Sequence, residues 1–305
     1  MARFAGRRNL WPALDISLPA GTKSVNHKLD ALLDDSEVFA IENLRVNSET
    51  FSDLESRRNT RRIYFSSHTS RNKAALIIVK NLGPDGARAM PIEVSDEGWI
   101  ERTQSALRAV QVGDLVVAPP WDRPAVSDKT LRVIEIEPSM GFGTGHHAST
   151  RLALRALQQY REDVALSNHL LDLGTGSGIL AIAAALLGAP SITAIDRDED
   201  ALTNARNNIA RNGVTTQVKI NQADLLEFNV NGADVIAANL TATFFERHSA
   251  VISRHLNASG ILILSGITAD DEPAVRASLE TKLSHAGRLI EDEWVALIFR
   301  AQPVK

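Results

Sequence analysis

Short apolar runs alternate with amphipathic stretches from about residue 170 to the C-terminus. The apolar runs at 170–173, 191–196 and 235–238 predict buried strands. The stretches between them carry apolar residues at helical spacing, and the clearest predicted helix, 199–212, is followed by Gly213 as a stop signal. Repeated strand–helix units with nearly continuous apolar strands predict an α/β fold, a doubly wound and mostly parallel sheet with helices on both faces.

The remaining elements continue this alternation. Predicted strands lie at 218–221, 261–264, 289–290 and 294–299, and predicted helices at 244–256 and 273–285. The last two strands have almost no connection between them, so this pair must be antiparallel.

The first part of the chain has a different pattern. Strands at 13–18, 38–41, 62–65 and 89–94, with helices at 24–33 and 73–82, predict a small βαββαβ (ferredoxin-like) domain. A helix at 97–110 and a strand at 114–118 follow. The length of 305 residues also favours two domains. We therefore predict a smaller α+β domain at 1–95, a linker helix and strand at 96–135, and the doubly wound domain at 136–305.

Composition narrows the class of protein. The net charge of −4 is too small to indicate nucleic-acid or membrane binding, and the absence of cysteine excludes disulfides and thiol catalysis. The longest apolar run, 179–187, is too short to span a bilayer. No apolar stretch follows the arginines near the N-terminus, so no secretory signal is readable. We expect a cytoplasmic protein.

A glycine-rich turn lies between the predicted strand at 170–173 and the next helix. Gly174, Gly176 and Gly178 would let a ligand approach the backbone closely, because glycine has no Cβ atom. Asp196 ends the following strand, where its carboxylate could accept two hydrogen bonds from a ribose diol. The pattern predicts a nucleotide-like cofactor, NAD or S-adenosylmethionine. A tight turn without a ligand is the alternative.

Two polar residues follow later strands of the predicted sheet. Asp224 follows the third strand, where methyltransferase folds often place an acid near the adenine amino group, although a turn residue is equally expected there. Asn239 follows the fourth strand and should face the ligand crevice, where its amide oxygen could accept a hydrogen bond from an incoming amine. Alternatively, Asn239 only caps the next helix.

A second glycine-rich segment, 138–150, leads into an amphipathic helix and could fold over a ligand. Ser149 or Thr150 would serve as an N-cap in the alternative interpretation. His146 and His147 are adjacent and lack a carboxylate at ligand spacing, so no metal site is predicted. A basic cluster in the first domain is expected to be a solvated loop, or else a contact for an acidic partner or ribosomal RNA; it comprises Arg57, Arg58, Arg61 and Arg62.

Several segments from about residue 96 to the C-terminus form a recognisable set, of which the F-G-T-G-x-H loop ahead of the glycine turn is the most specific. They are Trp99, the 114–121 segment, Phe142-Gly143-Thr144-Gly145 with His147 and Thr150, the turn at 171–184, Ala238-Asn239-Leu240, Leu264-Ser265-Gly266-Ile267 and Trp294-Val295-Ala296-Leu297. In these segments the chain resembles the ribosomal protein L11 methyltransferase family, class I enzymes with a Rossmann-like domain.

The resemblance implies S-adenosylmethionine as the cofactor, and methylation of lysine or N-terminal amines of ribosomal protein L11, free or on the ribosome, as the activity. It implies that the N-terminal domain grips this substrate. We expect no direct DNA partner and no membrane partner. We expect a monomer. We predict cofactor contacts by Thr150, Gly174, Gly176, Asp196, Asp224 and Asn239. The contacts by Gly176 and Asp224 are predicted from the sequence pattern, and the other four are implied by the resemblance.

Methyl transfer from a sulfonium is an in-line displacement, so the enzyme mainly aligns two reactants and needs no metal. A lysine is mostly protonated at pH 7, and burial beside a sulfonium favours its neutral form. We predict that Asn239 is the catalytic residue, orienting the neutral amine, while Thr150 closes the loop.

Some positions depart from the family pattern. His146, Ala148 and Ser149 replace Thr, Pro and Thr, the usual cysteine of the turn is Thr175, and the usual Ile after Asn239 is Leu240. None removes a cofactor group. The alternatives are a methyltransferase for another protein or small molecule, an NAD-dependent oxidoreductase, and a non-catalytic binding module.

Overall fold

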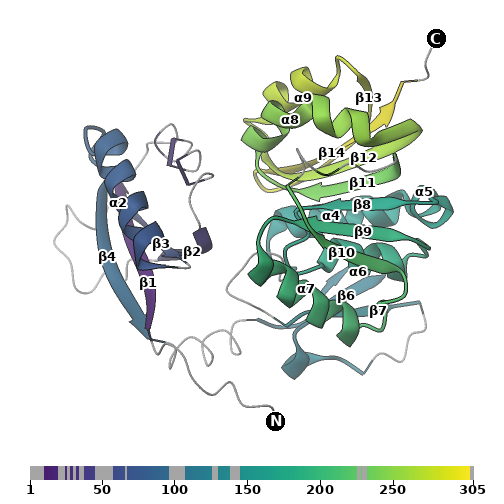
Figure 1. The fold of residues 1–305 in the computed structure, drawn as a ribbon, viewed down its shortest axis with the longest axis horizontal. Coiled ribbons are helices and arrows are strands. Elements are labelled where there is room, and N and C mark those ends of the chain that lie inside the picture. The colour runs from purple at the N-terminus through teal and green to yellow at the C-terminus, as the bar shows by residue number, and fades with distance from the viewer. Residues whose placement is uncertain are drawn as a thin grey trace. The chain divides into compact units, whose positions relative to one another are not determined.

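A computed structural model describes residues 10–19, 25, 28–29, 32–33, 38–44, 58–65, 67–95, 107–125, 130–137, 145–224, 228 and 232–302. The chain forms two compact units, 1–106 and 107–305, each with its own core (Figure 1). No helix in the described residues is both long and apolar enough to cross a membrane.

The first unit contains one antiparallel sheet with the strand order β2-β3-β1-β4. Its elements are β1 (Leu10–Pro19), β2 (Val38–Leu44), β3 (Arg58–Phe65), α2 (His68–Leu82) and β4 (Arg88–Ser95). The predicted helix 24–33 lies largely outside the described residues, although Val25, Leu29 and Leu33 are buried. Each predicted strand and the predicted helix 73–82 lie within an observed element, but β1, β3 and α2 begin three to five residues earlier than predicted. The role of this unit in recognising a substrate stays a prediction.

The second unit is built around a seven-stranded sheet with the order β10-β9-β8-β11-β12-β14-β13. The strands from β10 to β12 in this order are parallel, and β14 is antiparallel to both its neighbours. Its strands are β8 (Leu170–Leu173), β9 (Ile192–Asp196), β10 (Val218–Gln222), β11 (Ala233–Asn239), β12 (Leu256–Thr268), β13 (Leu283–Glu291) and β14 (Trp294–Ala301). This confirms the predicted α/β fold with a mostly parallel sheet.

Helices cover both faces of this sheet, as Figure 1 shows. They are α4 (Ala148–Gln159), α5 (Arg161–Leu166), α6 (Ile179–Leu186), α7 (Glu199–Arg211), α8 (Ala242–His255) and α9 (Glu272–Leu279). Residues of α4, α6 and α7 form one core cluster, and residues of α8 and α9 form the other. Along β8, Leu170 joins the first cluster, whereas Leu171 and Leu173 join the second. The apolar run at 170–173 is therefore a strand buried on both faces.

The predicted helix 273–285 is wrong at its C-terminal end. Helix α9 ends at Leu279, and Leu283 already begins β13. Pairing with β14 extends β13 beyond the short apolar run at 289–290, since the ladder hydrogen bonds form regardless of side-chain polarity.

A small sheet of three strands also belongs to the second unit. It comprises β5 (Val110–Val112), β6 (Leu115–Ala118) and β7 (Arg132–Glu135), with a 3-10 turn at Pro120–Asp122. Val110 begins a strand, so the predicted helix 97–110 does not reach its expected end, and its residues 97–106 lie outside the described part.

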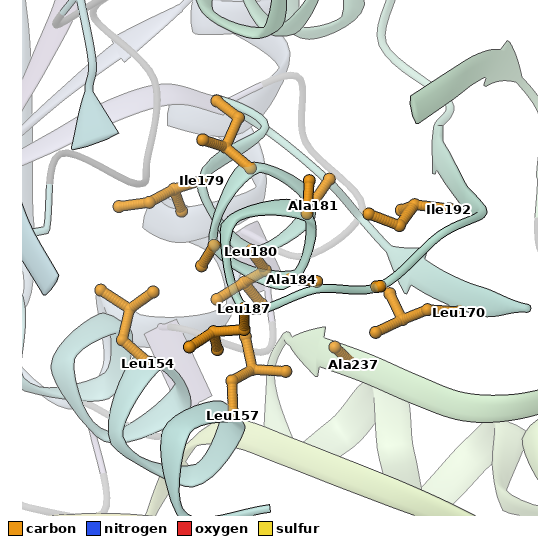
Figure 2. Close-up of a cluster of buried hydrophobic side chains, with 14 of the residues drawn as sticks. Leu154, Leu157, Leu170, Ile179, Leu180, Ala181, Ala184, Leu187, Ile192 and Ala237 are labelled. Atoms are coloured by element: carbon orange, nitrogen blue, oxygen red, sulfur yellow. The ribbon is translucent and has the colours of Figure 1, made fainter. Parts of the chain in front are cut away.

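Helix α6 explains why this small sheet packs into the core. Its residues 179–185 are all buried, and a helix that is apolar on every side must be covered on every side. Side chains of α4, β6 and β7 share its core cluster, including Leu154, Leu157 and Ile134. Figure 2 shows Leu154 and Leu157 of α4, and Leu170, Ile192 and Ala237 of the large sheet, around α6. Residues 107–135, predicted as part of a linker, therefore contribute to the larger unit.

Candidate functional site

The glycine turn after β8 has the backbone conformation that requires glycine. Gly174, Gly176 and Gly178 have φ of +66°, +53° and +83°. A Cβ atom at Gly174 would lie 2.6 Å from Leu240 Cδ2. Gly178 is the N-cap of α6 and provides no side-chain cap for its amides. The turn thus presents backbone and a helix N-terminus at the carboxyl edge of the sheet, as the sequence predicts.

Asp196, at the end of β9, is directly bonded to this turn. Its Oδ2 accepts a hydrogen bond from Gly176 N at 2.9 Å, and its Oδ1 accepts one from Asp198 N at 3.1 Å. The carboxylate is half-buried. The structure therefore brings the predicted acid and the predicted glycine together, since the two strands are adjacent and parallel.

Asp224 lies beyond the end of β10 and is exposed. The preceding residue, Ala223, donates its N–H to Asp196 O at 3.0 Å, so this segment runs beside Asp196. Residues 225–227 lie outside the described part. The position of Asp224 is compatible with both of its proposed roles, the adenine contact and the turn residue.

Asn239 and Thr150 meet at the same sheet edge. Asn239 ends β11, and its Nδ2 donates a hydrogen bond to Thr150 Oγ1 at 3.2 Å. Thr150, in the first turn of α4, is only 2% exposed. Within the described residues, Asn239 Oδ1 accepts no hydrogen bond. This oxygen retains its full capacity as an acceptor.

The capping alternatives for these residues are wrong. Helix α8 is capped by Thr241, whose Oγ1 accepts from Phe244 N at 3.4 Å, and not by Asn239. Helix α4 is capped by His147, whose Nδ1 accepts from Ser149 N at 3.3 Å. The hydroxyl of Thr150 is therefore not used to begin its own helix.

His147 is held in its capping position by its neighbours. Its ring packs edge-on against Trp294, with 4.5 Å between the ring centroids, and its Nδ1 lies 2.7 Å from Ser149 Oγ. Burial, followed by the charge of Arg151, lowers the pKa of His147, and Glu293 opposes this effect. A neutral imidazole can accept at Nδ1, as the cap requires. Among the described residues, no cluster of metal-ligating side chains is found.

One buried acid, Asp172, was not predicted as a site residue from the sequence. Asp172, within β8, has no exposed surface, and its Oδ2 accepts from Thr175 Oγ1 at 2.6 Å and Ala181 N at 3.1 Å. Burial raises the pKa of Asp172 to about 7, against the effect of these hydrogen bonds. Its Oδ1 has no partner in the described part of the chain. A carboxyl inside an otherwise apolar strand was the available signal.

The basic cluster of the first unit is not a loop over its described residues. Arg58, Arg61 and Arg62 lie on β3, and Arg57 lies outside the described part. Arg62 donates two hydrogen bonds to the Asp15 carboxylate, at 2.7 and 2.9 Å, and this pairing raises the pKa of Arg62. The Arg62 side chain thus stabilises the pairing of β3 with β1.

The site fits an adenosyl sulfonium. A glycine backbone, a helix N-terminus at which Asp172 bonds Ala181 N but the N-cap supplies no side-chain bond, and the carboxylates of Asp196 and Asp224 are suited to an amino-acid carboxylate, a ribose diol and an ammonium group. Asp172, whose Oδ1 has no partner among the described residues, is bonded to the same turn through Thr175 Oγ1. Nothing in this donor set requires a metal.

Comparison with known proteins gives the family. The model of the family "Ribosomal protein L11 methyltransferase (PrmA)" matches residues 12–302. The ribosomal protein L11 methyltransferase of Pelobacter propionicus is 37% identical over 211 residues, which are 68% of this chain and 68% of that protein. The one from Geobacillus kaustophilus is 36% identical over 212 residues, covering 68% of this chain and 66% of that protein.

A solved structure agrees with this match. The ribosomal protein L11 methylase from Lactobacillus delbrueckii subsp. bulgaricus superposes with a TM-score of 0.58 at 29% identity, covering 64% of this chain and 98% of that chain. Both kinds of comparison favour methyl transfer over an NAD-dependent oxidoreductase or a non-catalytic module. The chain belongs to the ribosomal protein L11 methyltransferase family and is an S-adenosylmethionine-dependent protein methyltransferase.

Proposed function

We propose that this enzyme methylates ribosomal protein L11, free or on the ribosome, on lysine side chains and the N-terminal amine. The observation that carries the proposal is the family match over residues 12–302, which includes the first unit as well as the second. Several relatives, including that of Pelobacter propionicus, carry the name of this substrate. Since ribosomal proteins are made in the cytoplasm, we place the enzyme there. We also propose that it acts as a monomer.

S-adenosylmethionine would supply an electrophilic methyl group on a sulfonium. We assign its binding to the carboxyl edge of the seven-stranded sheet. The backbone of Gly174 and Gly176 would hold the cofactor, the Asp196 carboxylate would accept from the ribose hydroxyls, and Asp224 would accept from the adenine amino group. The direct bond between Asp196 and Gly176 supports this arrangement, because it holds two of the proposed contacts in one geometry.

Asn239 then orients the acceptor amine. Its Nδ2 is engaged by Thr150, so its amide cannot rotate freely, and its Oδ1 remains available to accept an N–H from the substrate. An amine that donates to this oxygen directs its lone pair away from Asn239. Alignment of this kind accounts for roughly 7–11 kcal/mol in well-oriented reactions.

The amine must also be neutral. Freeing the lone pair of a lysine at pH 7 costs about 4–5 kcal/mol at its ordinary pKa. A site with little water and a neighbouring positive charge reduces this cost by disfavouring the ammonium form.

The substrate can be tested directly. The full chain is incubated with methyl-labelled S-adenosylmethionine and either purified L11, ribosomal subunits or total ribosomal protein, and labelled peptides are identified by mass spectrometry. We expect label on L11 amines, and none with Asn239→Ala. Label on a different protein would contradict the proposed substrate, and the absence of any transfer to protein would contradict the proposed reaction.

A further inference from the structure

Helix α7 packs against the glycine turn through one buried polar residue. The buried residues of this helix are Leu202, Ala205, Asn208 and Ile209. Asn208 is the polar member of this face and has no exposed surface. An asparagine in this environment is costly unless its amide is fully bonded, so its partners are informative.

Both ends of the Asn208 amide bond to backbone. Nδ2 donates to Ser177 O at 2.9 Å, and Oδ1 accepts from Glu137 N at 2.9 Å. The orientation of the amide follows from these partners, since only a donor can face a carbonyl and only an acceptor can face an N–H. Ser177 lies within the glycine turn, and Glu137 follows β7. Asn208 therefore joins the turn to the exit of β7.

The turn lies very close to α7 at this point. A Cβ atom at Gly178, the residue after Ser177, would lie 3.4 Å from Ala205 Cα. Ala205 is three residues before Asn208, on the same face of the helix. The turn thus lies beside α7 next to the Asn208 bond, with room there for little more than one added methyl group.

We propose that Asn208 is a positioning residue, which holds the glycine turn in the form that binds the cofactor by tying Ser177 to the end of β7. It does not touch the reacting atoms. This inference rests on the proposed binding of S-adenosylmethionine at the glycine turn. Loss of the Asn208 bridge leaves the turn bonded to Asp172 and Asp196 and packed beside Ala205, but removes the hydrogen bond that fixes Ser177 O to α7.

Asn212, one turn later on the same helix, is a matched control. Its Oδ1 accepts from Glu135 N at 2.8 Å, and its Nδ2 donates to Glu135 O at 2.7 Å. It therefore joins α7 to β7 with a similar pair of bonds. Its Nδ2 also donates to the backbone oxygen of Asn208 at 2.8 Å, but among the hydrogen bonds of the described residues it makes none with the glycine turn. The two asparagines differ in whether the turn is part of the bridge.

Asn208→Leu and Asn212→Leu are compared with the wild type by calorimetric titration with S-adenosylhomocysteine and by steady-state kinetics. We expect Asn208→Leu to weaken binding at least tenfold and to raise KM for S-adenosylmethionine more than it lowers kcat. Asn212→Leu should bind within twofold of the wild type. Equal affinities for the two variants, whether both reduced or both unchanged, would overturn the proposal.

The wild-type enzyme provides a second measurement that does not depend on a folded variant. Amide hydrogen exchange is followed with and without S-adenosylhomocysteine at single-residue resolution. Ordering of the turn should slow exchange at Glu137 N, which bonds to Asn208, by at least threefold, and leave Glu135 N, which bonds to Asn212, unchanged. Equal changes at the two amides, or none at Glu137, would contradict the role of Asn208.

The two proposals fail in distinguishable ways. A wild-type enzyme that does not bind S-adenosylhomocysteine would contradict the proposed cofactor site itself. A wild-type enzyme that binds this ligand while Asn208→Leu binds equally well would contradict only the inference about Asn208.

Discussion

Asn239 and Thr150, 89 residues apart in sequence, are joined by a hydrogen bond of 3.2 Å from Asn239 Nδ2 to Thr150 Oγ1. The bond connects the end of β11 to the first turn of α4, and Ser265 Oγ at the adjacent strand donates to Ser149 O at 2.9 Å. The start of α4 is thus attached to the carboxyl edge of the sheet at two neighbouring points. The side chain that is proposed to orient the substrate is itself oriented by the fold.

Removal of the Asn239 amide should impair the chemical step. We expect Asn239→Ala to lower kcat by about 10²–10³-fold, as loss of a polar group aimed at the reacting atoms does. The affinity for S-adenosylhomocysteine should change much less. Stopped-time methylation assays and calorimetry measure the two quantities, and near-normal turnover would show that Asn239 has another role.

The hydroxyl of Thr150 should act through Asn239. Thr150→Val removes the acceptor for Nδ2 with little change in volume, and we expect kcat to fall about tenfold, equivalent to about 1.4 kcal/mol. Thr150→Ser, which keeps the oxygen, should retain most of the activity. In Asn239→Ala the same Thr150→Val change should have little further effect, because the bond is already absent. Additive losses would indicate independent roles.

Asp196 should determine cofactor affinity. Asp196→Asn weakens charge-assisted bonds to a diol and to Gly176 N, each of which contributes about 1.5–3 kcal/mol. Loss of one such contribution reduces the affinity for S-adenosylhomocysteine by about 10–150-fold. Asp224→Asn, at an exposed position, is the control and should have a smaller effect. Fluorescence or calorimetric titration tests this order, and a larger effect of Asp224→Asn would reverse the assignment.

The buried carboxyl of Asp172 should make stability depend on pH. Its pKa is 3.8 ordinarily and about 7 in the fold, so unfolding between these values releases a proton. The contribution of Asp172 to the free energy of unfolding therefore falls as the pH rises from about 4 to about 7. Above pH 7 this contribution stays at its lowest value.

Asp172→Asn removes this titration. The substitution should raise the free energy of unfolding, relative to the wild type, by about 3 kcal/mol more at pH 8 than at pH 5. The wild type loses this amount because about two pH units lie between pH 5 and the pKa of about 7. Denaturant unfolding at both pH values measures the difference. Any fixed cost of an unpartnered amide cancels in the comparison, and an identical effect of the substitution at pH 5 and pH 8 would contradict the raised pKa.

Gly174 and Gly213 separate backbone strain from steric conflict. Their φ values are similar, +66° and +69°, but a Cβ at Gly174 meets Leu240 whereas one at Gly213 has nothing within 4 Å. Both Gly→Ala variants should lose about 1–2 kcal/mol of stability from positive φ. Only Gly174→Ala should also lower kcat, because it displaces Leu240 beside Asn239. Activity and melting assays distinguish the two losses, and equal kcat values would refute the steric effect.

The local sequence predicted the elements that have strong periodicity. The apolar runs at β8, β9 and β11 are strands, and α7 begins at Glu199 and ends just before Gly213. Parallel order then places Asp196 and Asn239 at one edge of the sheet, so their proximity to the turn was foreseeable. Strand β13 was predicted too short because its polar residues conceal it, and only pairing with β14 reveals its length.

What the sequence determined by itself is the alternation of strands and helices, the positive-φ turn, and the polar residues at strand ends, since each depends on neighbours only a few positions away. What only the tertiary structure decided are contacts between distant segments. These are the capping of α4 by His147, the bond between Asn239 and Thr150, the burial of Asp172, and the bridge made by Asn208. Periodicity tells which residues face inward, but a polar group that faces inward acquires its role from the donors and acceptors that packing brings to it.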